Sequence, residues 1–198
     1  MQSGLVYILQ SLVDMYLVAV ALRLALQWVR ADYRNPIVQF VVTVTNPLVV
    51  PLQKILAPMY KIDTATLVVF LVIQLGVTAA LTNFGCLTMP DVFTLLWLAI
   101  IRGLRLILNV YFFVVFGYVL MSWISSGAYN PSLAMLGNLL RELAAPVLQP
   151  VQRLIPPIAG WDLSPIFLLL ALRALATMLM SPAQQVAGGF MCQLGAIL

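Results

Sequence analysis

Four long apolar stretches limit what this chain can fold into. Crossing about 30 Å of hydrocarbon takes roughly 20 apolar residues in a helix, and four stretches reach or approach that length: Leu5–Val29, Thr64–Leu87, the part of Val92–Ile124 that starts near Ile100, and Leu163–Met180. Overall, 63% of the residues are hydrophobic and 8% are charged, which leaves too few polar side chains to cover a soluble globule. The sequence therefore predicts an all-α integral membrane protein with four transmembrane helices.

The residues that most enzymes use are scarce. The chain has no histidine, so neither a Ser-His-Asp triad nor an HExxH zinc site can form. Its two cysteines, Cys86 and Cys192, lack the spacing of metal ligands. The net charge of +4 is scattered and makes no basic face of the kind that binds a nucleic-acid backbone. We expect no catalytic activity, metal, cofactor or nucleic-acid partner.

An internal repeat organises the apolar stretches. Trp28 and Asn35-Pro36 recur 95 residues later as Trp123 and Asn130-Pro131. At an offset of 99 residues a longer series recurs, in which Pro47, Pro51, Gln53, Lys54, Pro58 and Asp63 match Pro146, Pro150, Gln152, Arg153, Pro157 and Asp162. Two spans in each copy return the chain to its starting side, so we expect the copies to enter the membrane in parallel.

The repeat also sets the expected domain boundaries. We interpret residues 1–90 as the first copy and residues 102–198 as the second copy with a C-terminal tail. The apolar run Val92–Ile124 has 33 residues, which is about 50 Å as one helix and too long for a simple span. We therefore expect residues 91–101 to form a linker or surface helix, with a hinge at Gly103.

Each copy carries a long segment between its two spans. Ile37–Thr45 is rich in β-branched residues that favour a strand, but a lone strand in lipid would leave its backbone unpaired. The matching segment in the second copy places leucines on one helical face and Asn138, Arg141 and Glu142 on the other. We expect an amphipathic surface helix in both copies, ended by a proline break and followed by a short basic helix.

Positive residues indicate which side of the membrane these segments face. Seven lie in or beside the two long segments: Arg23, Arg30, Arg34, Lys54, Lys61, Arg141 and Arg153. Arg102 and Arg105 lie on the opposite side. Because Lys and Arg favour the cytoplasmic side, we predict cytoplasmic long segments and both termini outside. Cys86 and Cys192 then lie on the same outer side, where they either form a disulfide or remain two free thiols.

Two proline-basic motifs are the most distinctive segments, Pro47, Pro51, Lys54 and Pro58 in the first copy and Pro146, Pro150, Arg153 and Pro157 in the second. Prolines four residues apart each remove a backbone donor and break a regular helix. Apolar residues beside each cation can enter the acyl boundary, while a cation near an anionic leaflet contributes about 1 kcal/mol. The motifs are either docking sites for anionic lipid or partner proteins, or shaped connectors. Asp63 and Asp162, which follow them, are predicted N-caps of the second and fourth spans.

These motifs, with Trp28 and Ser122-Trp123 closing the preceding spans, resemble the bacterial YggT family, also called YlmG, in its two-copy form. The resemblance covers essentially the whole chain. Ala145 stands where the first motif has Asn46, which argues against an essential chemical role for that asparagine. The resemblance implies an inner-membrane protein without catalytic residues. It also implies roles like those of its relatives in osmotic-stress tolerance, cell division or membrane organisation, and in plastids in cytochrome maturation and nucleoid distribution.

Each span carries one polar residue near mid-depth. Asp14 in the first span matches Asn109 in the third, and Gln74 in the second matches Arg173 in the fourth. A charge at this depth costs at least about 2.5–3.5 kcal/mol unless it is paired or hydrated. We therefore expect Asp14 to pair with Arg173 and join the copies, with Asn109 and Gln74 in the related contact. Arg23 lies nearer the end of its span and is expected to reach the head groups.

Two functions follow from these features. The first is a non-enzymatic inner-membrane protein that organises membrane-associated assemblies and docks anionic lipid or other membrane proteins through the proline-basic motifs. The alternative is a small ion or solute channel, or a transporter subunit, that uses the mid-depth polar residues as a hydrated site. Four helices enclose little volume, so a channel would require a homo-oligomer.

Overall fold

The computed structural model describes residues 2–56, 63–85, 90–124, 131–154 and 162–189. Over these ranges the chain forms α-helices and no strand. The helices are α1 (Gln2–Val29), α2 (Pro36–Gln53), α3 (Thr64–Gly85), α4 (Val92–Ile124), α5 (Pro131–Leu154) and α6 (Ser164–Gly189). The structure confirms an all-α fold, in which Ile37–Thr45 is helical despite its β-branched side chains.

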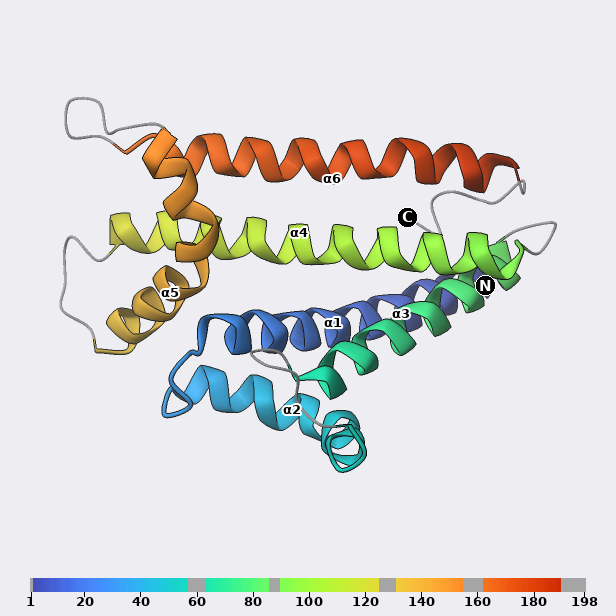
Figure 1. The fold of residues 1–198 in the computed structure, drawn as a ribbon, viewed down its shortest axis with the longest axis horizontal. Coiled ribbons are helices and arrows are strands. Elements are labelled where there is room, and N and C mark those ends of the chain that lie inside the picture. The colour runs from blue at the N-terminus through green and yellow to red at the C-terminus, as the bar shows by residue number, and fades with distance from the viewer. Residues whose placement is uncertain (1, 57–62, 86–89, 125–130, 155–161, 190–198) are drawn as a thin grey trace.

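The helices form a long bundle (Figure 1). α1 and α4 run in the same direction, and α3 and α6 run the opposite way. α2 and α5 each follow the C-terminal end of a long helix, so both begin at the same end of the bundle. α4 is central, because it packs against α3, α5 and α6 and also contacts α1. α1 in turn packs against α2 and α3.

Five of the described helices are long and apolar enough to cross a membrane. Four of them, α1, α3, α4 and α6, contain the spans expected from the sequence, and the fifth is α2. Large apolar side chains point outward along the bundle, among them Leu5, Met15, Phe113, Leu170 and Met178. Apolar surface of this extent fits a multi-pass membrane protein, since soluble monomers rarely expose it.

One hydrophobic core draws on all six helices. Each helix contributes at least one buried residue, for example Leu17, Val49, Phe70, Val115, Leu143 and Leu172. The first three helices and the last three therefore pack around a shared interior. This common core fixes α1 against α4, which is where the candidate site lies.

α4 differs from the expectation because it runs unbroken over Val92–Ile124. Residues 92–101 are its first turns, and the expected hinge at Gly103 is wrong. A Cβ atom at Gly103 would lie 3.1 Å from Cε1 of Phe70 and 3.5 Å from Cγ of Gln74. The glycine therefore allows α4 to approach α3 closely, and this packing explains its presence without a bend.

The expected break at the prolines is also wrong. α2 continues through Pro47 and Pro51, and α5 continues through Pro146 and Pro150. Each motif cation lies at the end of the same helix, and the described residues contain no separate short basic helix. Figure 1 shows both helices bending toward their C-terminal ends, which is the usual effect of an internal proline.

Candidate functional site

An ion pair joins α1 to α4. Nη2 of Arg102 lies 2.8 Å from Oδ1 of Asp14, and these side chains are 10% and 35% exposed, respectively. The expected pairing of Asp14 with Arg173 is therefore wrong. The guanidinium carbon of Arg173 lies 5.7 Å from the ring centroid of Phe112, so Arg173 makes a cation–π contact between α6 and α4.

A stagger between α1 and α4 explains the different partner. The repeat equates Asp14 with Asn109, but Asp14 contacts Arg102, which lies seven residues earlier on α4, or about 10 Å of helix. Residues that match in sequence thus do not lie at the same level in the bundle. Sequence reasoning missed Arg102 and Arg105 as site residues because it used them only as markers of orientation. Their spacing of three residues, which places them on one helical face inside an apolar run, is the signal that points to this site.

Gln74 does not form the expected contact with Asn109. Gln74 is fully buried on α3, and its amide nitrogen and oxygen have no hydrogen-bond partner among the described residues. Asn109 instead lines a cavity together with Asp14. The four residues expected at mid-depth therefore do not converge, because neither Gln74 nor Arg173 lines that cavity.

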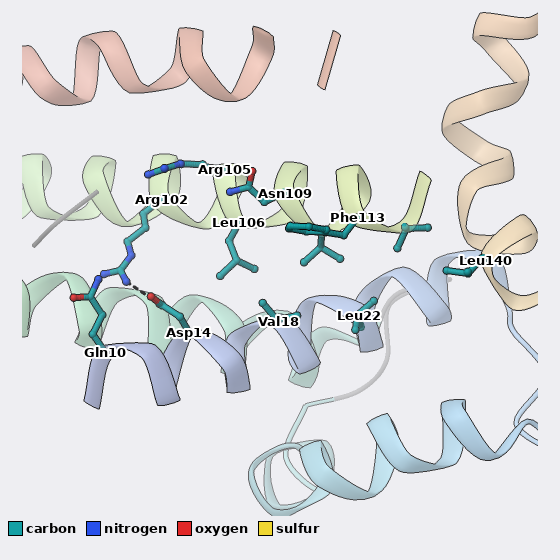
Figure 2. Close-up of a pocket in the computed structure, with 12 residues that line it drawn as sticks. Gln10, Asp14, Val18, Leu22, Arg102, Arg105, Leu106, Asn109, Phe113 and Leu140 are labelled. Atoms are coloured by element: carbon teal, nitrogen blue, oxygen red, sulfur yellow. Dashed lines mark hydrogen bonds and ion pairs between the residues drawn. The ribbon is translucent and has the colours of Figure 1, made fainter. Parts of the chain in front are cut away.

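The cavity lies between α1 and α4 and has a volume of about 550 Å³. Its polar end is lined by Gln10, Asp14, Arg102, Arg105 and Asn109. Apolar side chains continue from there toward α5 (Figure 2). Small-molecule sites typically measure about 300–1,000 Å³, so the cavity can hold an amphiphilic molecule. Within the part of the chain that the structure describes, no three His, Cys, Asp or Glu side chains group as metal ligands would.

A second buried arginine, Arg23, binds α2. The expectation that it reaches the head groups is wrong, because Arg23 is 5% exposed. Its Nη1 donates to Oγ1 of Thr45 at 2.8 Å and to Oδ1 of Asn46 at 2.9 Å. The same nitrogen donates to the carbonyl oxygen of Val42 at 3.3 Å. Arg23 thus joins α1 to the residues of α2 that directly precede Pro47.

The second half of the chain lacks this arginine cluster. At the matching positions Tyr118 replaces Arg23, Ala144 replaces Thr45 and Ala145 replaces Asn46. The arginine and both of its side-chain acceptors are thus exchanged together. Asn46 accordingly positions Arg23 in the first half, a role that the second half does not need.

Asp63 and Asp162 precede α3 and α6. One carboxylate oxygen of each accepts a hydrogen bond from the backbone N–H two residues later, at 3.1 Å and 2.9 Å. The other oxygen accepts from the side-chain amide of Gln53 or Gln152, respectively. Asp63 directly precedes α3, whereas Asp162 lies one residue before the N-cap position of α6. Burial raises the pKa of Asp162, but hydrogen bonds from Ser164 and Gln152 outweigh this effect and hold the pKa below its ordinary value.

The proline-basic motifs include two exposed cation–apolar pairs, Lys54–Ile55 at the end of α2 and Arg153–Leu154 at the end of α5. Ile55 is 84% exposed and Leu154 is 81% exposed. The two pairs match each other at the repeat offset of 99 residues. Several residues of the sequence predictions lie outside the described residues: Pro58, Lys61, Cys86, Asn130, Pro157 and Cys192.

The comparisons with known proteins cover most of the chain. The sequence model of the CCB3/YggT family matches two successive segments, residues 2–83 and 97–183. An uncharacterised protein of Pseudomonas aeruginosa is 38% identical over 174 residues, which are 87% of this chain and 86% of the relative. The uncharacterised protein YggT of Escherichia coli K12 is 33% identical over 174 residues, which are 86% of each chain. No solved structure matches the chain. The chain thus belongs to the CCB3/YggT family.

Proposed function

We propose that the protein is a non-enzymatic, multi-pass protein of the bacterial inner membrane that organises membrane-associated assemblies by holding anionic lipid at its two cation–apolar pairs. One observation carries this proposal. In each half, the cation of the proline-basic motif is followed by a large apolar side chain that is more than four-fifths exposed. Membership of the CCB3/YggT family supports a role at the membrane.

A cation next to an exposed apolar residue suits the membrane interface. The apolar side chain leaves water for the acyl boundary, while the cation stays at the level of the lipid phosphates. Each cation near an anionic leaflet contributes about 1 kcal/mol, so two pairs favour anionic over neutral lipid by about 2 kcal/mol. The hydrogen bonds of Gln53 to Asp63 and of Gln152 to Asp162 tie each pair to the start of the next helix.

The proposed topology has four spans, α1, α3, α4 and α6, in two parallel repeats. It is supported by the common direction of α1 and α4 (Figure 1), by the matching Gln–Asp hydrogen bonds and by the two segments that the family model matches. A full crossing by α2 would make α3 parallel to α1, yet α3 runs the opposite way. The charge distribution then favours α2 and α5 on the cytoplasmic side and both termini outside.

A spin label at Leu154 tests the lipid contact. The label is attached to Leu154→Cys, in a chain whose native cysteines are replaced by serine, in nanodiscs of phosphatidylcholine alone or mixed with phosphatidylglycerol. The label should move toward the acyl boundary in the anionic nanodiscs. Lys54→Glu combined with Arg153→Glu should abolish that shift.

The matched control reverses two other exposed cations. Arg34→Glu combined with Arg141→Glu makes the same change in net charge outside the motifs and should preserve the shift. Equal label depth in both kinds of nanodisc, or an equal loss in the control, would overturn the proposal. In cells, the Lys54→Glu and Arg153→Glu protein should reach wild-type membrane levels yet fail to restore growth after osmotic shift.

A channel or transporter subunit is the alternative function. The cavity that Asp14 and Asn109 share favours it, although Gln74 and Arg173 do not contribute. Purified protein in liposomes should then conduct ions or small solutes, and Asp14→Asn should reduce that flux while reversal of Lys54 and Arg153 leaves it unchanged. Absence of flux beside an active control channel would exclude this alternative.

A further inference from the structure

We infer that the cavity between α1 and α4 is the seat of one phospholipid with an anionic head group, whose phosphate binds Arg102 and whose acyl chain lies along the apolar end. This site is distinct from the two cation–apolar pairs, which lie at the ends of α2 and α5. The proposed function does not require it.

The charges at the polar end favour an anion. Among the described residues that line the cavity, two arginines, Arg102 and Arg105, accompany a single carboxylate, that of Asp14. Arg102 is more than nine-tenths buried. Its Nη2 binds Asp14, whereas its Nη1 has no hydrogen-bond partner among the described residues. A buried guanidinium nitrogen without a partner is costly in an apolar medium, and a phosphate oxygen is an acceptor that guanidinium groups bind strongly.

The rest of the cavity suits an acyl chain. Past the polar end, Val18 and Leu22 line one side, Phe113 lines the other, and Leu140 of α5 lies at the far end (Figure 2). Both Val18 and Phe113 are solvent-accessible, at 37% and 68% exposed. The cavity therefore opens sideways toward the lipid phase, which admits a chain from the bilayer.

The position of Arg102 along α4 places the charged end at head-group level. Trp123 is exposed near the C-terminal end of α4, where a tryptophan suits a membrane interface. Arg102 precedes Trp123 by 21 residues, which is about 31 Å of helix and matches a hydrocarbon thickness of about 30 Å. The guanidinium of Arg102 thus meets the phosphates of the opposite leaflet, and the acyl chain runs inward from there.

Photo-cross-linking tests this site in full-length protein in nanodiscs. The probe is phosphatidylglycerol or phosphatidylcholine with a diazirine in the acyl chain, and labelled peptides are mapped by mass spectrometry. Phosphatidylglycerol should label the cavity residues of α1 and α4 about fivefold more than phosphatidylcholine. Val18→Phe fills the apolar end and should reduce the labelling to background. The control Val44→Phe changes a valine of similar exposure, 38% against 37%, outside the cavity and should preserve the labelling.

A second variant separates lipid binding from folding. Asp14→Asn removes the carboxylate that competes for Arg102, so it should increase labelling by phosphatidylglycerol. A purely structural ion pair predicts unchanged lipid preference, and that result would overturn the inference. Equal labelling by the two lipids, or labelling that survives Val18→Phe, would also overturn it, as would a dimer seen by light scattering that Val18→Phe disrupts. Reversal of Lys54 and Arg153 should leave the labelling unchanged, so failure here is distinguishable from failure of the proposed function.

Discussion

Breaking the Asp14–Arg102 pair from its two sides should have unequal effects on stability. In a lipid-free neutral detergent, Asp14→Asn leaves Arg102 charged, about nine-tenths buried and without its counter-ion. Removal of one partner from a buried pair costs about 3–5 kcal/mol. Arg102→Gln leaves a carboxylate that is 35% exposed, so the expected cost is about 1–2 kcal/mol. The double variant removes both charges and should cost about 2 kcal/mol, which gives a coupling free energy of about 2–5 kcal/mol.

Thermal unfolding followed by tryptophan fluorescence measures this cycle. For a chain of this size, about 1 kcal/mol changes Tm by about 2–4 °C, so Asp14→Asn should lower Tm by roughly 6–20 °C. The control cycle combines Asp14→Asn with Arg173→Gln and should be additive within about 0.5 kcal/mol, because Arg173 contacts Phe112 instead. Additive effects of Asp14 and Arg102, or strong coupling between Asp14 and Arg173, would refute the geometry.

Three further predictions use the same unfolding assay. Gln74→Leu should leave stability unchanged or raise it by about 1 kcal/mol, because both amide atoms are buried without partners among the described residues; a loss of more than about 2 kcal/mol would contradict this. Gly103→Ala should cost about 1–2 kcal/mol, because the added Cβ would lie 3.1 Å from a side chain of α3. Gly76→Ala, whose Cβ would meet nothing within 4 Å, should change stability by less than about 0.5 kcal/mol; equal effects at the two glycines would argue against the α3–α4 contact. Asn46→Ala should cost about 1–2 kcal/mol because Arg23 loses an acceptor, and almost nothing in an Arg23→Met background; the same cost in both backgrounds would mean that the asparagine acts elsewhere.

The helices were predictable from the sequence, whereas their continuity was not. An apolar segment in lipid must satisfy its own backbone hydrogen bonds, so even the β-branched run Ile37–Thr45 forms a helix. A proline marks the loss of one backbone donor, but it does not show whether the helix continues past that residue, as α2 does at Pro47 and Pro51. Likewise, a glycine in an apolar helix is compatible with a hinge and with close packing. At Gly103 the contact with α3 decides between them.

In the candidate site too, contacts between residues close in sequence were predictable, whereas contacts between distant residues were not. The aspartates before α3 and α6 are predictable because their partners lie two residues away in the sequence. The partner of Asp14 is not, because matching positions in a repeat lie at equal depth only when the two copies are not staggered. The stagger of about two turns brings Arg102 to Asp14, and it results from how the whole of α4 packs on α1 and α3.

Some charged residues recur in both halves of the chain, whereas the ion pair between α1 and α4 does not. The exposed pairs Lys54–Ile55 and Arg153–Leu154 occur once in each half, as expected if each half meets the lipid surface independently. Asp14, in contrast, corresponds to the neutral Asn109 in the second half. Arg102 corresponds in the same way to the uncharged Tyr7 in the first half, so the ion pair has no counterpart in the repeat. A carboxylate at position 109 would lie in the same cavity without an equivalent arginine opposite it. Its negative charge would weaken the attraction of the polar end of the cavity for the lipid phosphate that we propose to bind there.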